Sequence, residues 1–277
     1  PWLRGIDSAT NESMPDSTRA SMADSEHWWR TRVPELPPAP AIASLTEMAA
    51  AGVPDIERVE RVIARPAWER IRTAAAAGRV TPTALVLAAY ARTLCADTGQ
   101  PACTINLTRF DREPSDIALT GCVGDFTSLV PVRASVSDDL LEMARSVQRD
   151  ILDATDHQEI SLDWISRELL RVTGDPGRAM FPVVFTSGFG LLDGGRLDDI
   201  GRLGELTRSR SQPPQTLIDL QIHDDARGVH LSADFTSQLL EHSRAAGWLE
   251  GIASALLAIS DDEEAGSDDI ERVVGDA

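Results

Sequence analysis

The sequence predicts an α/β domain in which helices cover one face of a mixed β-sheet. Three observations support this prediction. Segments with strand patterning alternate with segments of helical periodicity along the chain. Several of the expected strands are polar on one of their two faces. Finally, 42% of the 277 residues are hydrophobic, which is enough to fill a core of one large domain or two small ones.

The N-terminal part begins with a stretch of low periodicity. Residues 1–27 are rich in Ser, Asp, Asn and Pro, so we expect a flexible lead-in, with ordered structure beginning near Trp28. The prolines of residues 36–40 predict an extended linker or edge segment, because each fixes its own backbone and restricts its predecessor. Residues 59–64 have strand character, and residues 66–77 form an expected helix with proline in its first turn.

The middle of the chain contains the strongest helix start. Thr81 supplies a hydroxyl N-cap, and Pro82 follows at a position where its missing N–H costs nothing. We expect this helix to end near Ala96, before a Gly and a Pro. The next expected elements, in order, are a strand at 102–110, a strand at 126–133, a helix at 137–154 and a helix at 161–172.

The last third again alternates strand and helix. The expected elements are a strand at 181–186, a Gly-rich excursion at 188–211, a hairpin of 216–223 with 228–235, and a helix at 239–259. Residues 261–277 are strongly acidic and are predicted to be a flexible tail. The domain therefore extends over residues 28–260.

The hairpin yields a site hypothesis from its alternation. A period of two places Asp219 and Gln221 on the same face, opposite the apolar residues of the strand. If residues 224–227 form the turn, Asp219 lies opposite Ser232 and Gln221 lies opposite His230. Such a polar ladder is either an ordinary solvent-facing sheet surface or a site for chemistry, and the pattern alone leaves both open.

Two other strands offer polar groups in the same ambiguous way. Thr186 ends its strand beside Ser187 and Gly188, a suitable place to hold a substrate carbonyl and also a common turn. In residues 102–110 the polar side includes Asn106 and Thr108, for which a structural role is the alternative.

Charge and cysteine content exclude several function classes. The chain has 44 acidic and 26 basic residues and a formal charge of −18, which disfavours nucleic acid and membrane surfaces as partners. Cys95, Cys103 and Cys122 form no CxxC pair and no zinc set with the five histidines, so we expect buried thiols and no metal site. We find neither a secretory signal nor an apolar run of about 20 residues, and we predict a cytoplasmic protein.

Several blocks, in a fixed order, resemble one protein family. They are similar to the central and late motifs of the heterocyclization (Cy) variant of nonribosomal peptide synthetase condensation domains. The blocks are Thr81–Ala91, Ile105–Thr108, Gly124–Ser128, Pro182–Ser187 and Ser211–Gln221. The resemblance covers roughly residues 28–258 and implies the C-terminal lobe of such a domain, with a fold like that of chloramphenicol acetyltransferase.

The resemblance also implies site residues. Thr186 and Asp219 match the threonine and aspartate implicated in cyclodehydration in that family. Gln215 and Gln221 flank Asp219 and are expected to orient it. The other supporting or substrate-binding residues implied by the motifs are Asn106, Asp125, Thr127, Ser187 and Ser211.

The function implied by the resemblance is formation of a five-membered ring. A carrier-bound acyl thioester is joined to a carrier-bound Cys, Ser or Thr, and cyclodehydration then closes a thiazoline or oxazoline. No cofactor binds directly, because the substrates arrive on phosphopantetheine arms of peptidyl or acyl carrier proteins. Alternatives are plain amide-forming condensation and a non-catalytic lobe that docks a separate N-terminal lobe or a carrier protein.

One part of the family pattern is missing from the sequence. Condensation domains carry HHxxxDG, or DxxxxDxxS in cyclizing members, in their N-terminal lobe, and neither motif occurs in these 277 residues. The resemblance therefore implies an N-terminal condensation lobe, on the same or a separate polypeptide, as a partner.

Overall fold

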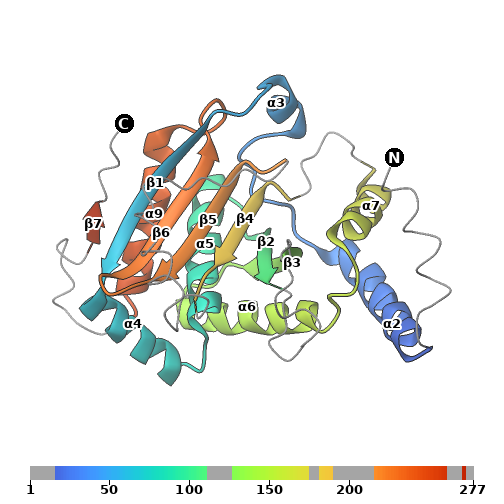
Figure 1. The fold of residues 1–277 in the computed structure, drawn as a ribbon, viewed down its shortest axis with the longest axis horizontal. Helices are drawn as coiled ribbons and strands as arrows, with labels where there is room; N and C mark the ends of the chain where they lie inside the picture. The colour runs from blue at the N-terminus through green and yellow to red at the C-terminus, as the bar shows by residue number, and fades with distance from the viewer. Residues whose placement is uncertain (1–15, 111–126, 175–180, 190–214, 261–269, 273–277) are drawn as a thin grey trace, which may run out of the picture.

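A single mixed sheet forms the centre of the computed structural model, which describes residues 16–110, 127–174, 181–189, 215–260 and 270–272 (Figure 1). Seven strands pair in the order β3-β2-β4-β5-β6-β1-β7. Their bounds are β1 Ile56–Ala64, β2 Ala102–Phe110, β3 Thr127–Ser135, β4 Val183–Ser187, β5 Ile218–Asp224, β6 Gly228–Thr236 and β7 Ile270–Arg272. Strand β4 is parallel to β2 and β5, and the remaining pairs are antiparallel.

The helices pack on and around this sheet. Their bounds are α2 Asp16–Arg32, η1 Val33–Glu35, α3 Leu45–Ala50, α4 Arg65–Ala77, α5 Pro82–Thr98, α6 Leu140–Thr155, α7 Leu162–Thr173 and α9 His242–Leu257. Figure 1 looks onto one face of the sheet, with α5 and α9 lying behind it. The predicted fold class, a mixed sheet with helices on one face, is confirmed.

The face toward α5 and α9 is the apolar one. Phe185 of β4, Leu220 of β5 and Phe235 of β6 are fully buried in the core on that side. Helix α5 is apolar nearly all round and is buried from Ala84 to Ala91, as expected for a helix enclosed by a sheet and other helices. The opposite face of the sheet is therefore left for the polar residues of the same strands.

Local signals determine where α5 begins and ends. The Thr81 hydroxyl accepts a hydrogen bond from the Ala84 N–H at 3.2 Å, and Pro82 occupies the first turn, as predicted. The helix extends to Thr98, slightly beyond the predicted Ala96, and ends at Gly99 with a left-handed φ of 69°.

Two terminal predictions are wrong. Helix α2 begins at Asp16, so residues 16–27 are not an unstructured lead-in. Tertiary contacts explain the helix, because Trp29 donates to the His157 carbonyl at 3.0 Å and the Ser25 hydroxyl donates to Glu159 at 2.9 Å. In the acidic C-terminal segment 261–277, residues 270–272 form β7 and pair with β1, which the charge pattern did not indicate. Helices α3 and η1 were also not predicted.

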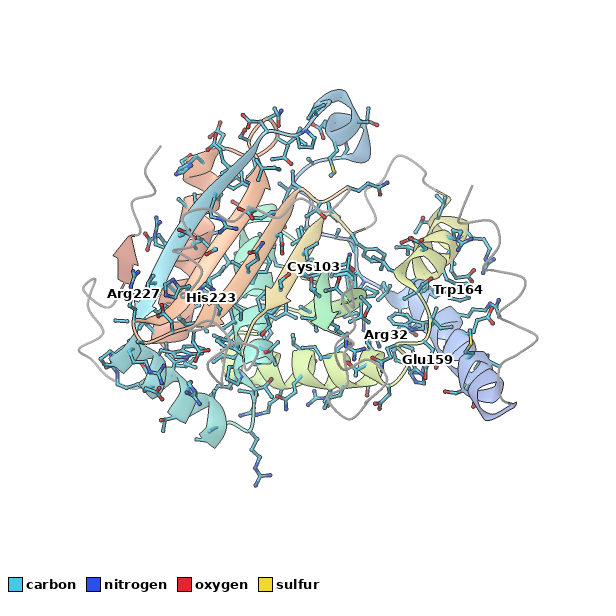
Figure 2. The ribbon with its side chains drawn as sticks, viewed as in Figure 1. Arg32, Cys103, Glu159, Trp164, His223 and Arg227 are labelled. Atoms are coloured by element: carbon cyan, nitrogen blue, oxygen red, sulfur yellow. The ribbon has the colours of Figure 1, made fainter. Side chains whose placement is uncertain are left out.

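A buried ion pair fastens α2 to the rest of the domain. Arg32 at the end of α2 contacts Asp150 of α6, and both side chains are less than 10% exposed. The Asp150 carboxylate also accepts the backbone N–H of Arg133 at 2.7 Å. The Arg32 guanidinium lies 4.7 Å from the centre of the Trp28 ring, and Figure 2 shows Arg32 and Glu159 in this region.

Candidate active site

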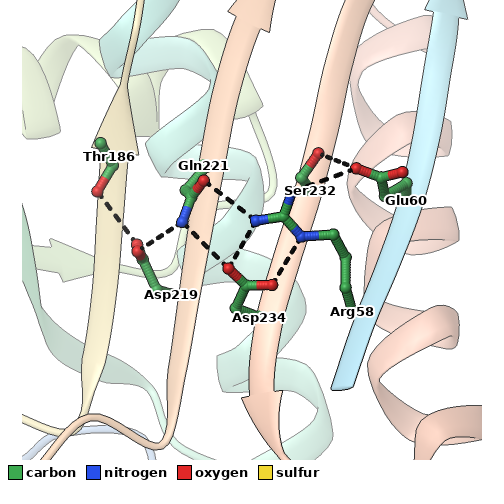
Figure 3. A network of polar contacts seen from close by, with 7 residues as sticks. All are labelled: Arg58, Glu60, Thr186, Asp219, Gln221, Ser232 and Asp234. Carbon is green, nitrogen blue, oxygen red and sulfur yellow. Dashed lines mark hydrogen bonds and ion pairs between the residues drawn. The ribbon is translucent and has the colours of Figure 1, made fainter. Parts of the chain in front are cut away.

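A row of polar side chains crosses the sheet on the face away from α5 and α9 (Figure 3). In the observed pairing, Thr186 of β4 lies beside Gln221 of β5, and Asp219 of β5 lies opposite Asp234 of β6. Further along, Asp234 is paired with Arg58 of β1. Because side chains on paired residues share a face, four strands contribute to one continuous polar surface.

The hairpin register differs from the prediction. Asp219 is opposite Asp234 rather than Ser232, and Gln221 is opposite Ser232 rather than His230. Strand β5 continues to Asp224, and the loop closes at residues 225–228 instead of 224–227. The Asp225 side chain stabilises this loop, since it accepts the N–H groups of Arg227 at 2.8 Å and Gly228 at 3.2 Å. A slip of two residues keeps every side chain on its predicted face but changes its partner.

Thr186 and Asp219 are in direct contact. The Thr186 hydroxyl lies 3.1 Å from Asp219 Oδ1 and 2.9 Å from the Thr108 hydroxyl of β2. A hydroxyl has one proton to donate, so Thr186 cannot donate to both oxygens at once. When Thr186 donates to the carboxylate, Thr108 donates to Thr186. The three groups then form a short chain along which a proton can move.

The second oxygen of Asp219 is held by Gln221. The Gln221 Nε2 donates to Asp219 Oδ2 at 3.0 Å and to Asp234 Oδ2 at 3.3 Å. Arg58 completes the arrangement by donating to Asp234 through two nitrogens, at 2.7 and 2.6 Å, and to Gln221 Oε1 at 3.4 Å. The amide is therefore shared by two carboxylates on one side and faces a guanidinium on the other.

Burial increases the strength of these contacts. Asp219 and Asp234 are 3% and 2% exposed, whereas the side chains of Arg58 and Glu60 are 20% and 31% exposed. Ser232 donates to Glu60 at 2.9 Å, so the network extends outward along β1. The hydrogen bond to Asp234 raises the pKa of Arg58 above its ordinary value, against the opposing effect of partial burial. The network thus runs from a buried end at Asp219 to a partly exposed end at Glu60.

Beyond the network, two histidines continue the same face. His223 stacks on His230, with ring centres 4.6 Å apart, and His230 Nε2 lies 3.0 Å from Asp225 Oδ1. Burial, together with the neighbouring His230, lowers the pKa of His223. Figure 2 shows His223 toward the hairpin end of the sheet.

Not every predicted supporting residue joins this network. Gln221 does, but Gln215 is exposed, has a φ of 60°, and does not flank the carboxylate. Ser187 is on the opposite face, where its hydroxyl lies 2.8 Å from that of Thr83. The structure therefore does not bring Gln215 or Ser187 into the network around Asp219; for Ser187 the reason is that alternation turns adjacent residues of a strand to opposite faces.

The remaining predicted residues have varied positions. Asn106 is buried on the polar face, next but one to Thr108, and its Nδ2 lies 3.5 Å from the Phe181 carbonyl. Thr127 is exposed at the start of β3. Asp125 and Ser211 lie outside the described residues.

Arg58, Glu60 and Asp234 were missed by the analysis of the sequence. A signal existed in β6, where Ser232 and Asp234 alternate with apolar residues, but not in β1, where Glu57 and Arg61 interrupt the alternation around Arg58 and Glu60. For Asp234 the correct hairpin register was lacking. For Arg58 and Glu60 the pairing of β1 with β6 was lacking, since these two strands are separated by most of the chain.

The cysteine and metal predictions concern the rest of the molecule. Cys95 and Cys103 are buried and form no disulfide, as predicted, whereas Cys122 lies outside the described residues. The contact with Cys95, together with burial, raises the pKa of the Cys103 thiol. Over the described ranges there is no cluster of three or more His, Cys, Asp or Glu side chains suited to a metal ion, and no helix there could cross a bilayer.

Comparisons with known proteins agree with this architecture. Residues 14–274 match the family model of the condensation domain. Pyochelin synthetase PchF of Pseudomonas aeruginosa is 30% identical over 249 residues, which is 87% of this chain and 13% of PchF. Phenyloxazoline synthase MbtB of Mycobacterium tuberculosis is 30% identical over 231 residues, or 80% of this chain and 16% of MbtB.

Solved structures share the fold. The EpoB cyclization-docking bidomain from Sorangium cellulosum superposes with a TM-score of 0.75 at 27% identity, covering 87% of this chain and 49% of that one. The X-domain from teicoplanin biosynthesis, at 17% identity and a TM-score of 0.67, shares the fold alone. The chain therefore spans about half of these solved chains and a much smaller part of the curated relatives.

Proposed function

This chain belongs to the condensation-domain family, and on that premise we propose that it supplies the cyclodehydration residues of a heterocyclization domain. In the proposed reaction, a carrier-bound acyl thioester condenses with a carrier-bound Cys, Ser or Thr. The resulting amide then closes to a thiazoline or oxazoline. Asp219 is the proposed general base and acid, and Thr186 is the group that hydrogen-bonds the reacting carbonyl oxygen.

One observation carries this proposal. Thr186 and Asp219 come from adjacent parallel strands, and their oxygens are 3.1 Å apart on the polar face of the sheet. A carboxylate that is buried and hydrogen-bonded by a hydroxyl and an amide is held in one orientation. Such a fixed carboxylate beside a hydroxyl is suited to passing protons in a reaction that needs two transfers.

The proposed ring closure balances as follows. The thiol or hydroxyl of the acceptor side chain attacks the amide carbonyl carbon and forms the new C–S or C–O bond, while Asp219 takes its proton. The carboxyl then returns that proton to the former carbonyl oxygen, with Thr186 as the neighbour that can relay it. As the C=N bond forms, Asp219 takes the amide N–H proton and delivers it to the hydroxyl on the former carbonyl carbon. The C–O bond then breaks and that oxygen leaves as water.

The relatives support azoline formation over plain condensation. PchF and MbtB are both about equally similar to this chain, and the name of MbtB specifies an oxazoline product. The solved EpoB structure is that of a cyclization domain with a docking domain. By this analogy the proposed partners are carrier proteins bearing phosphopantetheine arms and an N-terminal condensation lobe.

The test is reconstitution with an N-terminal lobe and loaded carrier proteins. We expect Asp219→Asn and Thr186→Val to release amide but to lose ring closure by on the order of 10²-fold or more. Ser187→Ala, on the other face of β4, is the matched control and should retain closure. Mass spectrometry separates the products, because the azoline is lighter by one water.

Three results would contradict the proposal. Azoline release by Asp219→Asn at the unmodified rate would remove the carboxylate from the mechanism. Amide as the sole product of the unmodified protein would identify plain condensation. Binding of a carrier or N-terminal lobe without any product, and without loss of binding when both residues are changed, would identify a non-catalytic partner.

A further inference from the structure

We infer that Arg58 and Asp234 are positioning residues for Asp219, acting through the amide of Gln221. Their ion pair determines which way the amide points, and it supplies positive charge beside two carboxylates on neighbouring strands. The inference about positioning stands on the geometry alone. Its catalytic consequence rests on the proposed function of Asp219.

The amide of Gln221 has one acceptable orientation. Its Nε2 faces Asp219 and Asp234, and its Oε1 faces Arg58. Rotating the amide by half a turn would place its oxygen against two carboxylate oxygens and its NH₂ group against a guanidinium. Both contacts would then be repulsive. Arg58 and Asp234 therefore ensure that an N–H donor is directed at Asp219 Oδ2.

The ion pair of Arg58 with Asp234 also reduces the negative charge around Asp219. Asp219 and Asp234 are directly opposite each other in the β5–β6 ladder, where like charges destabilise a sheet. Both are almost fully buried, so solvent screens their repulsion poorly. The bidentate contact of Arg58 offsets the charge of Asp234 and so reduces the repulsion between the two facing carboxylates.

Other titratable groups lie near this pair. Glu60 on β1, His223 on β5 and His230 on β6 share its face of the sheet. Tyr90 on α5 lies behind the sheet, where burial and the charge of Asp219 raise its pKa. Of the acids, Glu60 is near enough to Arg58 to pair with it at 3.6 Å. Tyr90 is a neutral phenol at any pH used below, so the pH response of the network comes from the carboxylates and the two histidines.

The first experiment measures thermal unfolding of the chain from about pH 5 to pH 8. Removing the cation in Arg58→Met leaves two adjacent carboxylates, which makes the folded state bind protons more readily than the unfolded state. Its stability relative to the unmodified protein should therefore fall as pH rises. Changing Asp234→Asn in the Arg58→Met background removes the second carboxylate and should abolish most of that pH-dependent loss.

The matched control is Arg61→Met. Arg61 is also on β1 but faces the other side, where it pairs with Glu250 at 2.7 Å. Its loss exposes no second carboxylate across the ladder, so its Tm deficit should change little with pH. The same two histidines are present in every variant, and the comparison of Arg58→Met with the double variant isolates the contribution of the Asp234 carboxylate. Equal pH dependence in Arg58→Met and Arg61→Met, or no recovery in the double variant, would overturn the inference.

The second experiment follows azoline formation against pH in the reconstituted system. With Arg58→Met we expect the rising limb of the rate to move to higher pH, and with the added Asp234→Asn change we expect it to move back. A purely structural role would lower the rate at every pH without moving the limb. If Arg58→Met leaves the rising part of the pH–rate profile at the same pH while azoline formation still requires Asp219, the inference is overturned and the proposed function stands. Azoline formation without Asp219 overturns the proposed function, while the unfolding data still decide the inference.

Discussion

Replacing Gln221 by glutamate tests the network with almost no change of shape. The substitution exchanges the NH₂ group that lies between Asp219 and Asp234 for an oxygen. In the present structure that nitrogen is 3.0 Å from Asp219 Oδ2 and 3.3 Å from Asp234 Oδ2. An ionised glutamate would therefore bring a third negative charge into contact with two others.

The size of the effect follows from these distances. Each contact between two full charges at about 3 Å costs roughly 5 kcal/mol at an effective dielectric constant of about 20. The attraction of Arg58, 3.4 Å from the other side of the amide, offsets about one of the two. Protonating a carboxyl of ordinary pKa at pH 7 costs only about 3.7 kcal/mol, at about 1.4 kcal/mol per pH unit above 4.3. The smaller cost prevails, so the new glutamate should be neutral in the folded protein.

This reasoning gives a pH-dependent stability. The folded protein holds the proton more tightly than the unfolded chain, so the penalty is absent below the unfolded pKa and grows as pH rises. Relative to Gln221→Met, which adds no charge, Gln221→Glu should lose about 1 kcal/mol at pH 5 and about 4 kcal/mol at pH 7. Urea unfolding of both variants at three pH values measures the difference. A difference that does not change between pH 5 and pH 7 would show that the amide does not lie between two ionised carboxylates.

Two further predictions concern stability. A Cβ on Gly228, whose φ is 149°, would meet the backbone of β1 at 2.0 Å, so Gly228→Ala should lower the free energy of unfolding in urea by on the order of 3–5 kcal/mol. A Cβ on Gly247 would meet nothing, so Gly247→Ala should stabilise α9 slightly. Similar unfolding free energies for the two variants would refute the packing argument. Asp150→Asn breaks the buried ion pair with Arg32 and should lower the free energy of unfolding by about 3–5 kcal/mol. The control Asp153→Asn, at an exposed position on the same helix, should change it little. A loss below about 1 kcal/mol for Asp150→Asn would contradict the role given to that ion pair.

Most of the fold could be predicted because its signals are local. The cap at Thr81 and the alternation in β2, β5 and β6 are properties of short segments. Helix α2 and strand β7 could not be predicted in this way. Each is stabilised by partners far away in the chain, α2 by contacts with residues 150–159 and β7 by pairing with β1.

The residues of the candidate site also fall into those that local sequence signals indicate and those that depend on distant pairing. Alternation placed Asp219 and Gln221 on one face, and family resemblance selected Thr186 as their neighbour. Gln215 and Ser187 lie outside the network, because closeness in sequence to a site residue says little about the face that a side chain occupies. Asp234 was missed because the predicted hairpin register was off by two residues, and Arg58 could not be selected because its position depends on a strand order that joins β1 to β6.

The hairpin register shows why this matters for chemistry. A slip of two residues leaves the polar face polar, so a prediction from alternation survives it. The slip nevertheless replaces Ser232 by Asp234 as the residue opposite Asp219, and so replaces a neutral hydroxyl by a second carboxylate. A buried carboxylate opposite a hydroxyl needs no compensating cation, whereas a buried carboxylate opposite a second carboxylate does. The Asp225 side chain stabilises the loop of this register by accepting two backbone N–H groups, and in this register Asp219 lies beside the ion pair of Arg58 with Asp234.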